Sequence, residues 1–353
     1  MPPPPAFHNF VVLENDAGQR LDRYLAAQLP ELSRSRIQEL IESGHVLLDG
    51  KATKGARKLR ASDRIAVEAQ DRPPTRAEAE SIPLEILYED ADLVVVNKAA
   101  GMTVHAGAGN TRGTLVNALL GRGQALSRGG DALRPGIVHR LDKETSGAIL
   151  VAKNDFTHAK LAEAFQKRAV KKTYIALVEG LLKERLGRIE LPIGRDLHRR
   201  TRMAVYHPKA GMPNRGGVRH ARTDWRTLAE LDGTTLVEVQ LHTGRTHQIR
   251  VHFAALKHPV VGDTLYGARA QLRVAGDDSR KSSAKQKLQP DVLPPLGRNF
   301  LHAARLGLSQ PRTGEWIEVQ APLPLELREF VKQLASAAGE ERERIDAALA
   351  PYL

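Results

Sequence analysis

The sequence of 353 residues contains no cysteine, few aromatic residues and no long apolar run. Without cysteine the chain cannot form disulfides, thiolate zinc sites or cysteine-ligated iron–sulfur clusters, and this composition fits a reducing cytoplasm, where we expect the protein to reside. No run approaches the roughly 20 apolar residues of a membrane-spanning helix, so we expect no membrane partner. Aromatic residues make up 4% of the chain, which argues against a long stacking groove for single-stranded RNA.

Positive charge is in excess, because 53 Lys and Arg face 41 Asp and Glu, which leaves a formal charge of +12. Such an excess favours a polyanionic partner such as nucleic acid, since cations that neutralise phosphates release counterions. A basic soluble enzyme with another substrate has the same composition. Hydrophobic residues make up 41%, an ordinary value for a globular protein, which excludes wholesale disorder.

The first 70 residues have the pattern of a small separate unit. Residues 1–15 begin with a run of prolines and are expected to form a flexible tail. Apolar residues then recur at helical spacing in two segments, and the Asp49-Gly50 dipeptide predicts a β-hairpin. We therefore predict a small α/β domain over residues 16–70, followed by a charged, proline-containing linker at residues 71–81.

Residues 82–337 alternate strand-like apolar segments with occasional helical patterns. The continuous apolar run at 93–96 predicts a strand that is buried on both faces, and a strand-rich order of this kind predicts an α+β fold. Residues 268–295 form a polar insertion that contains Lys and Pro. Residues 338–353 are expected to be a C-terminal tail.

Four short stretches, at residues 97–105, 136–147, 172–174 and 243–252, are dense in Arg, His, Lys and Gly. Glycines beside charged residues between apolar strands indicate loops that permit close backbone approach. Asp142 has basic neighbours, so it is either a structural ion-pair partner or a carboxylate that a guanidinium keeps ionised and nucleophilic. The histidines lack zinc-ligand spacing and no phosphate-loop pattern is present, so we predict neither a metal nor a cofactor.

Together these stretches resemble the motifs of the RluA/RluD family of RNA pseudouridine synthases. Gly-Ile-Val-His-Arg-Leu-Asp-Lys-Glu-Thr-Ser-Gly at 136–147 is similar to the family's catalytic motif, and residues 244–252 and the pairs Asn97-Lys98 and Val104-His105 are similar to further signatures. Residues 16–70 resemble the S-four RNA-binding domain. This domain and the stretch 105–110 are similar to the RluD-like branch, which modifies large-subunit ribosomal RNA.

The resemblance, which covers roughly residues 16–335, implies an α+β fold on a mixed, largely antiparallel sheet with the site in a cleft across it. It implies that RNA is the partner and that the reaction is a cofactor-free isomerisation of uridine. Ala99 and Ala106 stand where the family often has proline, which leaves these loops less rigid.

The resemblance also implies roles for particular residues. Asp142 would be the catalytic nucleophile or base, and it is left open whether it attacks the ribose or the uracil. Arg250 would pair with Asp142 and orient it, Tyr174 would lie against the uracil and take the proton from its carbon five, and Arg140 would fill the space that the flipped nucleotide vacates. Phosphate contacts are expected from Arg34, Arg36, Arg195, Arg199, Arg200, Arg202 and Arg245.

Other interpretations remain at this point. Tyr174 could be core packing on a strand and Arg250 a solvated charge on a helix. The chain could be a transfer RNA pseudouridine synthase, a non-catalytic RNA-binding ribosome-assembly factor, or a hydrolase that uses Asp and His on phosphate esters. We expect a monomer.

Overall fold

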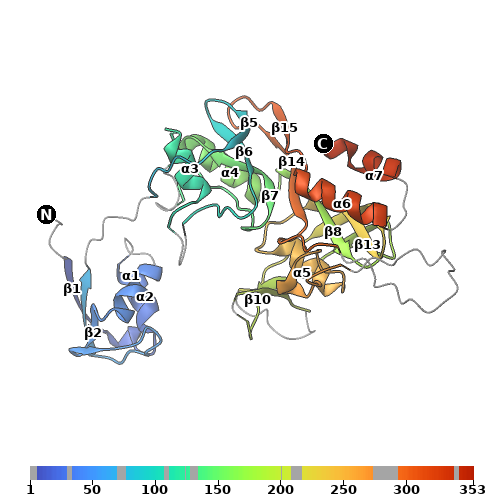
Figure 1. Ribbon diagram of the computed structural model, residues 1–353. Helices are drawn as coiled ribbons and strands as arrows, with labels where there is room; N and C mark the ends of the chain where they lie inside the picture. Colours follow the sequence, from blue (N-terminus) through green and yellow to red (C-terminus); the bar gives the residue numbers. More distant parts are fainter. Residues whose placement is uncertain are drawn as a thin grey trace. The chain divides into compact units, whose positions relative to one another are not determined.

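The structure is a computed structural model that describes residues 6–29, 34–69, 77–106, 111–123, 125–127, 134–199, 201–207, 217–272, 293–337 and 342–353. The chain divides into two compact units, Met1–Thr75 and Arg76–Leu353 (Figure 1). Within the described ranges, no helix is both long and apolar enough to cross a membrane. Most of the predicted insertion at 268–295 lies outside the described residues.

The first unit is a four-stranded antiparallel sheet with two helices. The sheet order is β1 (Ala6–Val11), β4 (Arg64–Ala69), β2 (Val46–Leu48) and β3 (Lys51–Ala52). The predicted hairpin joins β2 to β3, and both turn residues, Asp49 and Gly50, have the positive φ that a two-residue hairpin requires. Helices α1 (Leu21–Gln28) and α2 (Arg34–Glu42) contribute to the core of this unit, which includes Leu21, Leu25, Ile37 and Leu40.

The expectation of a flexible tail over residues 1–15 is wrong for the part that the structure describes. Strand β1 pairs with β4 from Ala6↔Ala69 to Val11↔Arg64, and the 3-10 turn Glu14–Asp16 follows it. Pairing satisfies the backbone donors and acceptors of an edge strand, and Val12 is buried directly after it. The segment after the prolines, Ala6–Val11, therefore determines the structure of this region.

The second unit is built on a nine-stranded sheet. Its strands follow the order β5 (Glu85–Glu89), β6 (Leu93–Lys98), β7 (Ser146–Ala152), β14 (Leu301–Ser309), β8 (Lys171–Glu179), β13 (Thr234–Leu241), β12 (Thr223–Leu231) and β9 (Leu186–Ile189), and β15 (Trp316–Gln320) pairs with β14. Among the pairings of these strands, β7 with β14 is parallel and the others are antiparallel. The predicted α+β fold on a mixed, largely antiparallel sheet is confirmed. A separate hairpin comprises β10 (Ile193–Arg195) and β11 (Met203–Val205).

The predicted two-sided burial of the 93–96 segment is found in β6. Val94 and Val96 join the larger hydrophobic cluster, whereas Leu93 and Val95 join a second cluster with residues of α4 (Asp155–Gln166). This division follows from the alternation of side chains along a strand. Helices α3 (Leu115–Gly121), α5 (Gln248–Ala255) and α6 (Leu325–Ala337) add their apolar residues to the larger cluster.

The C-terminal tail expected at 338–353 is also wrong where the structure describes it. Helix α7 (Arg342–Leu349) and the 3-10 turn Ala350–Tyr352 place Ile345, Leu349 and Tyr352 in the larger cluster. The Tyr352 hydroxyl donates a hydrogen bond to Glu238 on β13. The three apolar residues are spaced by three or four positions, a helical pattern within a highly charged segment.

Candidate active site

All four stretches that the sequence singled out contribute to one cavity of about 530 Å³ in the second unit. Its walls are the loop at 134–145, the end of α4 with the start of β8, and the turn at 241–247 that leads into α5. His105 contributes from the first stretch and Lys172 and Tyr174 from the third. Segments that are far apart in the sequence thus surround one space, which spacing alone could not show.

Asp142 stands on a loop that begins and ends at glycines with positive φ. Gly136 has φ 73°, and a Cβ there would lie 2.5 Å from the carbonyl oxygen of Ala152. Gly147 has φ 112°, and a Cβ there would lie 2.3 Å from the carbonyl oxygen of Ala303, where β7 pairs in parallel with β14. Both positions therefore require glycine, which explains why glycines bound this stretch.

Lys98 fastens the loop that carries Asp142 to the first stretch. Its side chain is fully buried, and Nζ donates to the carbonyl oxygens of Ala99, Met102 and Lys143 at 2.7, 2.8 and 3.0 Å. Burial, together with the positive charge of Arg298, lowers the pKa of Lys98 to about 7. Three carbonyl acceptors satisfy the buried amine, so the position of the Asp142 loop is defined by both stretches.

The Asp142 carboxylate is held by an arginine that is itself fixed. Arg250, on α5, donates from Nη1 to Asp142 Oδ2 at 3.1 Å. The Nε and Nη2 groups of Arg250 donate to the two oxygens of buried Asp263 at 2.5 and 2.9 Å. Burial alone would lower the pKa of Arg250, but the two carboxylates raise it, so the guanidinium stays charged. The two-point contact with Asp263 sets the guanidinium plane and points Nη1 at Asp142.

The second oxygen of Asp142 faces a histidine. His247 Nε2 lies 4.0 Å from Asp142 Oδ1, which is beyond hydrogen-bond distance and leaves that oxygen open to the cavity. His247 Nδ1 is 2.8 Å from the hydroxyl of Tyr266, and this hydroxyl also accepts a hydrogen bond from the backbone of Met203. Burial lowers the pKa of His247, so its ring is neutral at pH 7. The ring of Tyr266 lies 5.0 Å from the Arg250 guanidinium.

Tyr174 lies on β8 and lines the same cavity, with 7% of its surface exposed. Burial and the negative charge of Asp142 both raise the pKa of its hydroxyl above the ordinary value. The resting protein therefore carries Tyr174 as a neutral phenol.

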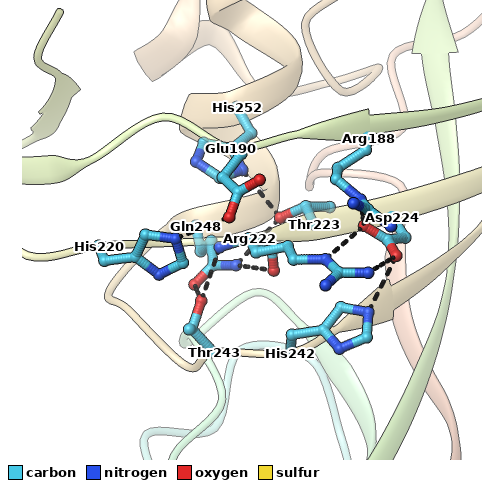
Figure 2. Close-up of polar contacts among 10 residues, drawn as sticks. All are labelled: Arg188, Glu190, His220, Arg222, Thr223, Asp224, His242, Thr243, Gln248 and His252. Carbon is cyan, nitrogen blue, oxygen red and sulfur yellow. Dashed lines mark hydrogen bonds and ion pairs between the residues drawn. The ribbon is translucent and has the colours of Figure 1, made fainter.

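A buried chain of hydrogen bonds fixes the start of α5 (Figure 2). The side-chain oxygen of Gln248 accepts from the hydroxyl of Thr243 at 2.7 Å, and its amide donates to Thr223 Oγ1 at 3.0 Å. The Thr223 hydroxyl donates to His252 Nδ1 at 2.8 Å, because His252 Nε2 donates to the carbonyl of Leu191 at 3.0 Å. Since every member is bonded, the chain sets the rotation of α5 and with it the direction of Arg250.

A second cluster in Figure 2 neutralises cations beside the cavity. Asp224 accepts two hydrogen bonds from Arg222, at 3.0 and 2.6 Å, and one from Arg188 at 3.2 Å. His242, which lines the cavity, has Nε2 3.0 Å from the same carboxylate. The hydrogen bonds from Arg222 contribute most to lowering the pKa of Asp224, to about 2, so this carboxylate is ionised throughout the neutral range.

Comparisons with known proteins identify the families that the two units match. Residues 92–255 match the family model described as RNA pseudouridylate synthase, and residues 19–65 match the S4 domain. An uncharacterised RNA pseudouridine synthase of Chloroflexus aurantiacus is 45% identical over 93% of this chain and 94% of its own.

The chain belongs to the RNA pseudouridine synthase family. Ribosomal large subunit pseudouridine synthase D of Escherichia coli K12 is 37% identical over 95% of this chain and 96% of its own. The solved structure of human RNA pseudouridylate synthase domain containing 1 has a TM-score of 0.50 and 27% identity, and covers 77% of this chain and 96% of that one. As a pseudouridine synthase the protein is an isomerase whose substrate is RNA, and its N-terminal unit contains an S-four domain.

The structure gathers part of the predicted set of site residues in this pseudouridine synthase. Asp142, Tyr174, Arg250, Arg140 and Arg245 all line the cavity, and the predicted contact between Arg250 and Asp142 is present.

The remaining predicted residues do not line the cavity or cannot be described. Arg195 and Arg199 lie at the β10–β11 hairpin, and Arg202 pairs with Asp196 at 2.9 Å and packs on the ring of Tyr266. Arg200, the stretch 107–110, and the side chains of Arg34 and Arg36 lie outside what the structure describes.

Two residues of the site were missed by the sequence reasoning. Asp263 and Tyr266 follow the four stretches and had drawn no attention, although each stands next to a glycine with positive φ, Gly262 and Gly267. Asp263 beside Gly262 has the pattern of a charged residue next to glycine that indicates a loop of this kind, and it is the signal that could have found Asp263.

Proposed function

We propose that this protein converts uridines of large-subunit ribosomal RNA to pseudouridine, with Asp142 as the group that initiates the reaction. The observation that carries this proposal is the arrangement around Asp142. One carboxylate oxygen is held by Arg250, which Asp263 fixes, and the other opens into the cavity. A preorganised carboxylate of this kind can act without first rearranging the groups around it.

The isomerisation balances without a co-reactant. The bond between N1 of uracil and C1′ of ribose breaks, the uracil turns, a bond from C5 to C1′ forms, C5 loses a proton and N1 gains one. Attack by the Asp142 carboxylate, on the ribose or on the uracil, gives a covalent intermediate that divides the step into two easier ones. The charge-assisted hydrogen bond from Arg250 holds one oxygen of this carboxylate in place for the attack.

Tyr174 is proposed to take the proton from C5. Its place in the cavity wall allows the ring to lie against the uracil. Because the raised pKa keeps the hydroxyl protonated, the phenol passes its own proton to solvent water as it accepts the one from C5, and N1 takes its proton from solvent water. A positioned proton carrier typically contributes 10²–10⁴-fold to a rate.

Arg140 is proposed to fill the space that the target nucleotide leaves when it turns out of the RNA. Its side chain is exposed at the cavity, next to buried Leu141. Extruding a stacked base costs about a few kcal/mol, and an inserted guanidinium offsets part of this cost. Arg34, Arg36, Arg195, Arg199, Arg200, Arg202 and Arg245 remain proposed phosphate contacts.

Large-subunit ribosomal RNA is the proposed target because relatives that match nearly the whole chain are named for that activity. The S-four domain gives a second RNA-binding unit, as a large structured substrate requires. An enzyme of ribosomal RNA acts where ribosomes are made, so the cytoplasm is its proposed location and a monomer its proposed state.

The test is tritium release from a large-subunit ribosomal RNA transcript labelled at carbon five of uridine, with wild type and Asp142→Asn side by side. We expect release by the wild type alone, while both proteins bind the transcript. Release by Asp142→Asn at the wild-type rate would remove Asp142 from its role. Release from transfer RNA transcripts in place of ribosomal RNA would contradict the proposed target but keep the reaction.

A further inference from the structure

The cavity has a second charged region, away from Asp142. Lys172, Arg168 and Arg245 all line it, from the start of β8, the end of α4 and the turn before α5. Within the described part of the chain, none of the three pairs with a carboxylate, and the charges that act most on Lys172 are the other two cations. Arg245 has one neutral partner, the carbonyl of His220, to which its Nε donates at 3.1 Å.

Lys172 is the centre of this group. It precedes Tyr174 by two residues on β8, so both side chains point to the same face of the sheet. Its ammonium lies 5.6 Å from the ring of Phe165, which in turn stacks on His139 at 4.7 Å. Burial lowers the pKa of His139 to about 3, so this ring adds no positive charge, and its Nε2 accepts a hydrogen bond from Leu150. Phe165 gives the ammonium an aromatic contact but no negative charge.

The lack of a carboxylate partner among the described residues distinguishes these three cations from Arg250. Arg250, which lines the same cavity, is bound by the carboxylates of Asp142 and Asp263. A partly buried charge without a partner is costly, and burial together with Arg168 and Arg245 lowers the pKa of Lys172 to about 8. A bound anion would remove this cost, and RNA supplies one at every linkage.

The backbone of Arg168 adds an independent observation. Arg168 follows the C-terminal end of α4 and has φ 60°, in the left-handed region. Helices commonly end on such a residue, and glycine is preferred there because a side chain strains that backbone. Arginine at this position therefore gives no advantage to the helix end itself, but it directs a guanidinium to the cavity.

We propose that Lys172, Arg168 and Arg245 form a subsite for one backbone phosphate next to the uridine that is being isomerised. This inference rests on the proposed function, because it takes Asp142 and Tyr174 as the place of the uracil. Two residues along a strand span about 6.6 Å, which suits a phosphate one linkage away from a base that lies against Tyr174. Guanidinium and ammonium groups are the usual partners of phosphate oxygens.

The test compares two adjacent lysines. Lys172→Met removes the charge inside the cavity, and Lys171→Met removes the same charge from the next residue of β8, which is exposed and points to the other face near Trp316. Equilibrium binding of the ribosomal RNA transcript is measured against salt concentration. We expect Lys172→Met to weaken binding about tenfold and to lower the salt slope by about 0.7, the share of one phosphate of a single strand. Lys171→Met should keep the wild-type slope, and Lys172→Arg should restore it.

Arg168→Asn separates a binding role from a structural one. Asparagine accepts the left-handed backbone better than arginine does, so the thermal midpoint should be unchanged or higher. RNA affinity should nevertheless fall several-fold, in a variant that cannot be dismissed as misfolded. Equal salt slopes for Lys172→Met and Lys171→Met, or full affinity in Arg168→Asn, would overturn the subsite.

The binding readout is independent of turnover. If the wild type released no tritium from any RNA but the slopes differed as expected, the proposed reaction would fail and the phosphate subsite would stand. If turnover were present and the slopes were equal, the reaction would stand and the subsite would fail.

Discussion

Two parts of the cavity lining, called here the Asp142 end and the Lys172 end, differ in how their cations are paired. At one end Arg250 is bound by Asp142 and Asp263, both of whose carboxylates lie within hydrogen-bond distance. At the other end Lys172 and Arg168 have no carboxylate partner among the described residues. Both groups of residues line the same cavity.

The two cations therefore have different functions. Arg250 fixes the position of a neighbouring group, whereas Lys172 is available to bind an anion. A guanidinium with both edges bonded has one orientation and fixes the group that it touches. An ammonium without a partner keeps its capacity for an anion, at a cost that the ligand removes. Changes at the Asp142 end should therefore act on the chemical step, and changes at the Lys172 end on the binding of RNA.

The largest effect is expected from Asp142→Asn. The substitution keeps the shape of the side chain but removes the charge that attacks, so turnover should fall by about 10³-fold or more. The rate of tritium release measures this, with RNA affinity as the control. A loss of affinity in place of a loss of rate would mean that Asp142 serves binding, and the contrast between the two ends would disappear.

A somewhat smaller effect is expected from Asp263→Asn, which leaves Asp142 unchanged and frees one edge of Arg250. Turnover should fall by about 10²-fold, because the guanidinium no longer has one orientation, and breaking a buried ion pair should cost about 3 kcal/mol of stability. Asp92→Asn is the matched control. Asp92 is a buried carboxylate with two hydrogen bonds from Arg312, outside the cavity lining. Asp92→Asn should lower the free energy of unfolding without lowering turnover. If both variants lost turnover equally, the effect of Asp263→Asn on turnover would be non-specific.

Tyr174→Phe tests the proposed proton transfer at the Asp142 end. The ring contact is kept and the hydroxyl is lost, so turnover should fall about 100-fold if the hydroxyl carries the C5 proton. Affinity for RNA should stay within a factor of two or so. A fall of less than about tenfold would leave Tyr174 with a packing role only.

The pH dependence of RNA binding should distinguish the ends. Lys172 is charged below its pKa of about 8 and neutral above it, and phosphate binds the charged form. Affinity should therefore decrease as pH rises through about 8, by a factor of three to ten or so. His139, whose pKa is about 3, does not titrate in this range, and guanidinium groups in proteins are charged throughout it. RNA affinity is measured between pH 6.5 and 9. The wild type should show this decrease, and Lys172→Arg should not. A decrease that persists in Lys172→Arg would have another origin.

The smallest effect is expected outside the cavity, in the first unit. Replacing Arg34 and Arg36 on α2 by Gln should weaken RNA binding several-fold and reduce its salt dependence, because phosphate contacts are lost. The rate at saturating RNA should survive. An unchanged salt slope would exclude these two arginines as phosphate contacts.

Much of the Asp142 end could be predicted from the sequence, and almost none of the Lys172 end. The stretch at 136–147 is long and specific, and its glycines are required by close backbone contacts that no other residue tolerates. Asp263 escaped prediction because its importance lies in a contact with Arg250 that depends on how the turn after α5 folds back. That Lys172 has no carboxylate partner among the described residues could not be predicted, because which side chains approach it depends on how the whole cavity folds.

The ends of the chain show a similar limit. Proline and charge suggested tails at 1–15 and 338–353, whereas β1 completes a sheet edge and Tyr352 is buried against β13. Composition describes how a segment behaves alone, but the free partners that a sheet or a hydrophobic cluster offers decide whether it folds.

Single-turnover tritium release at increasing enzyme concentration, for Asp142→Asn and Lys172→Met, tests this division of the cavity. Each series gives the rate at saturation and the concentration that half-saturates it. We expect Asp142→Asn to lose the rate and to keep the half-saturating concentration near that of the wild type. We expect Lys172→Met to need about tenfold more enzyme and then to recover most of the rate. If both variants lost the same parameter, the division of the cavity into a reacting end and a phosphate-binding end would be wrong.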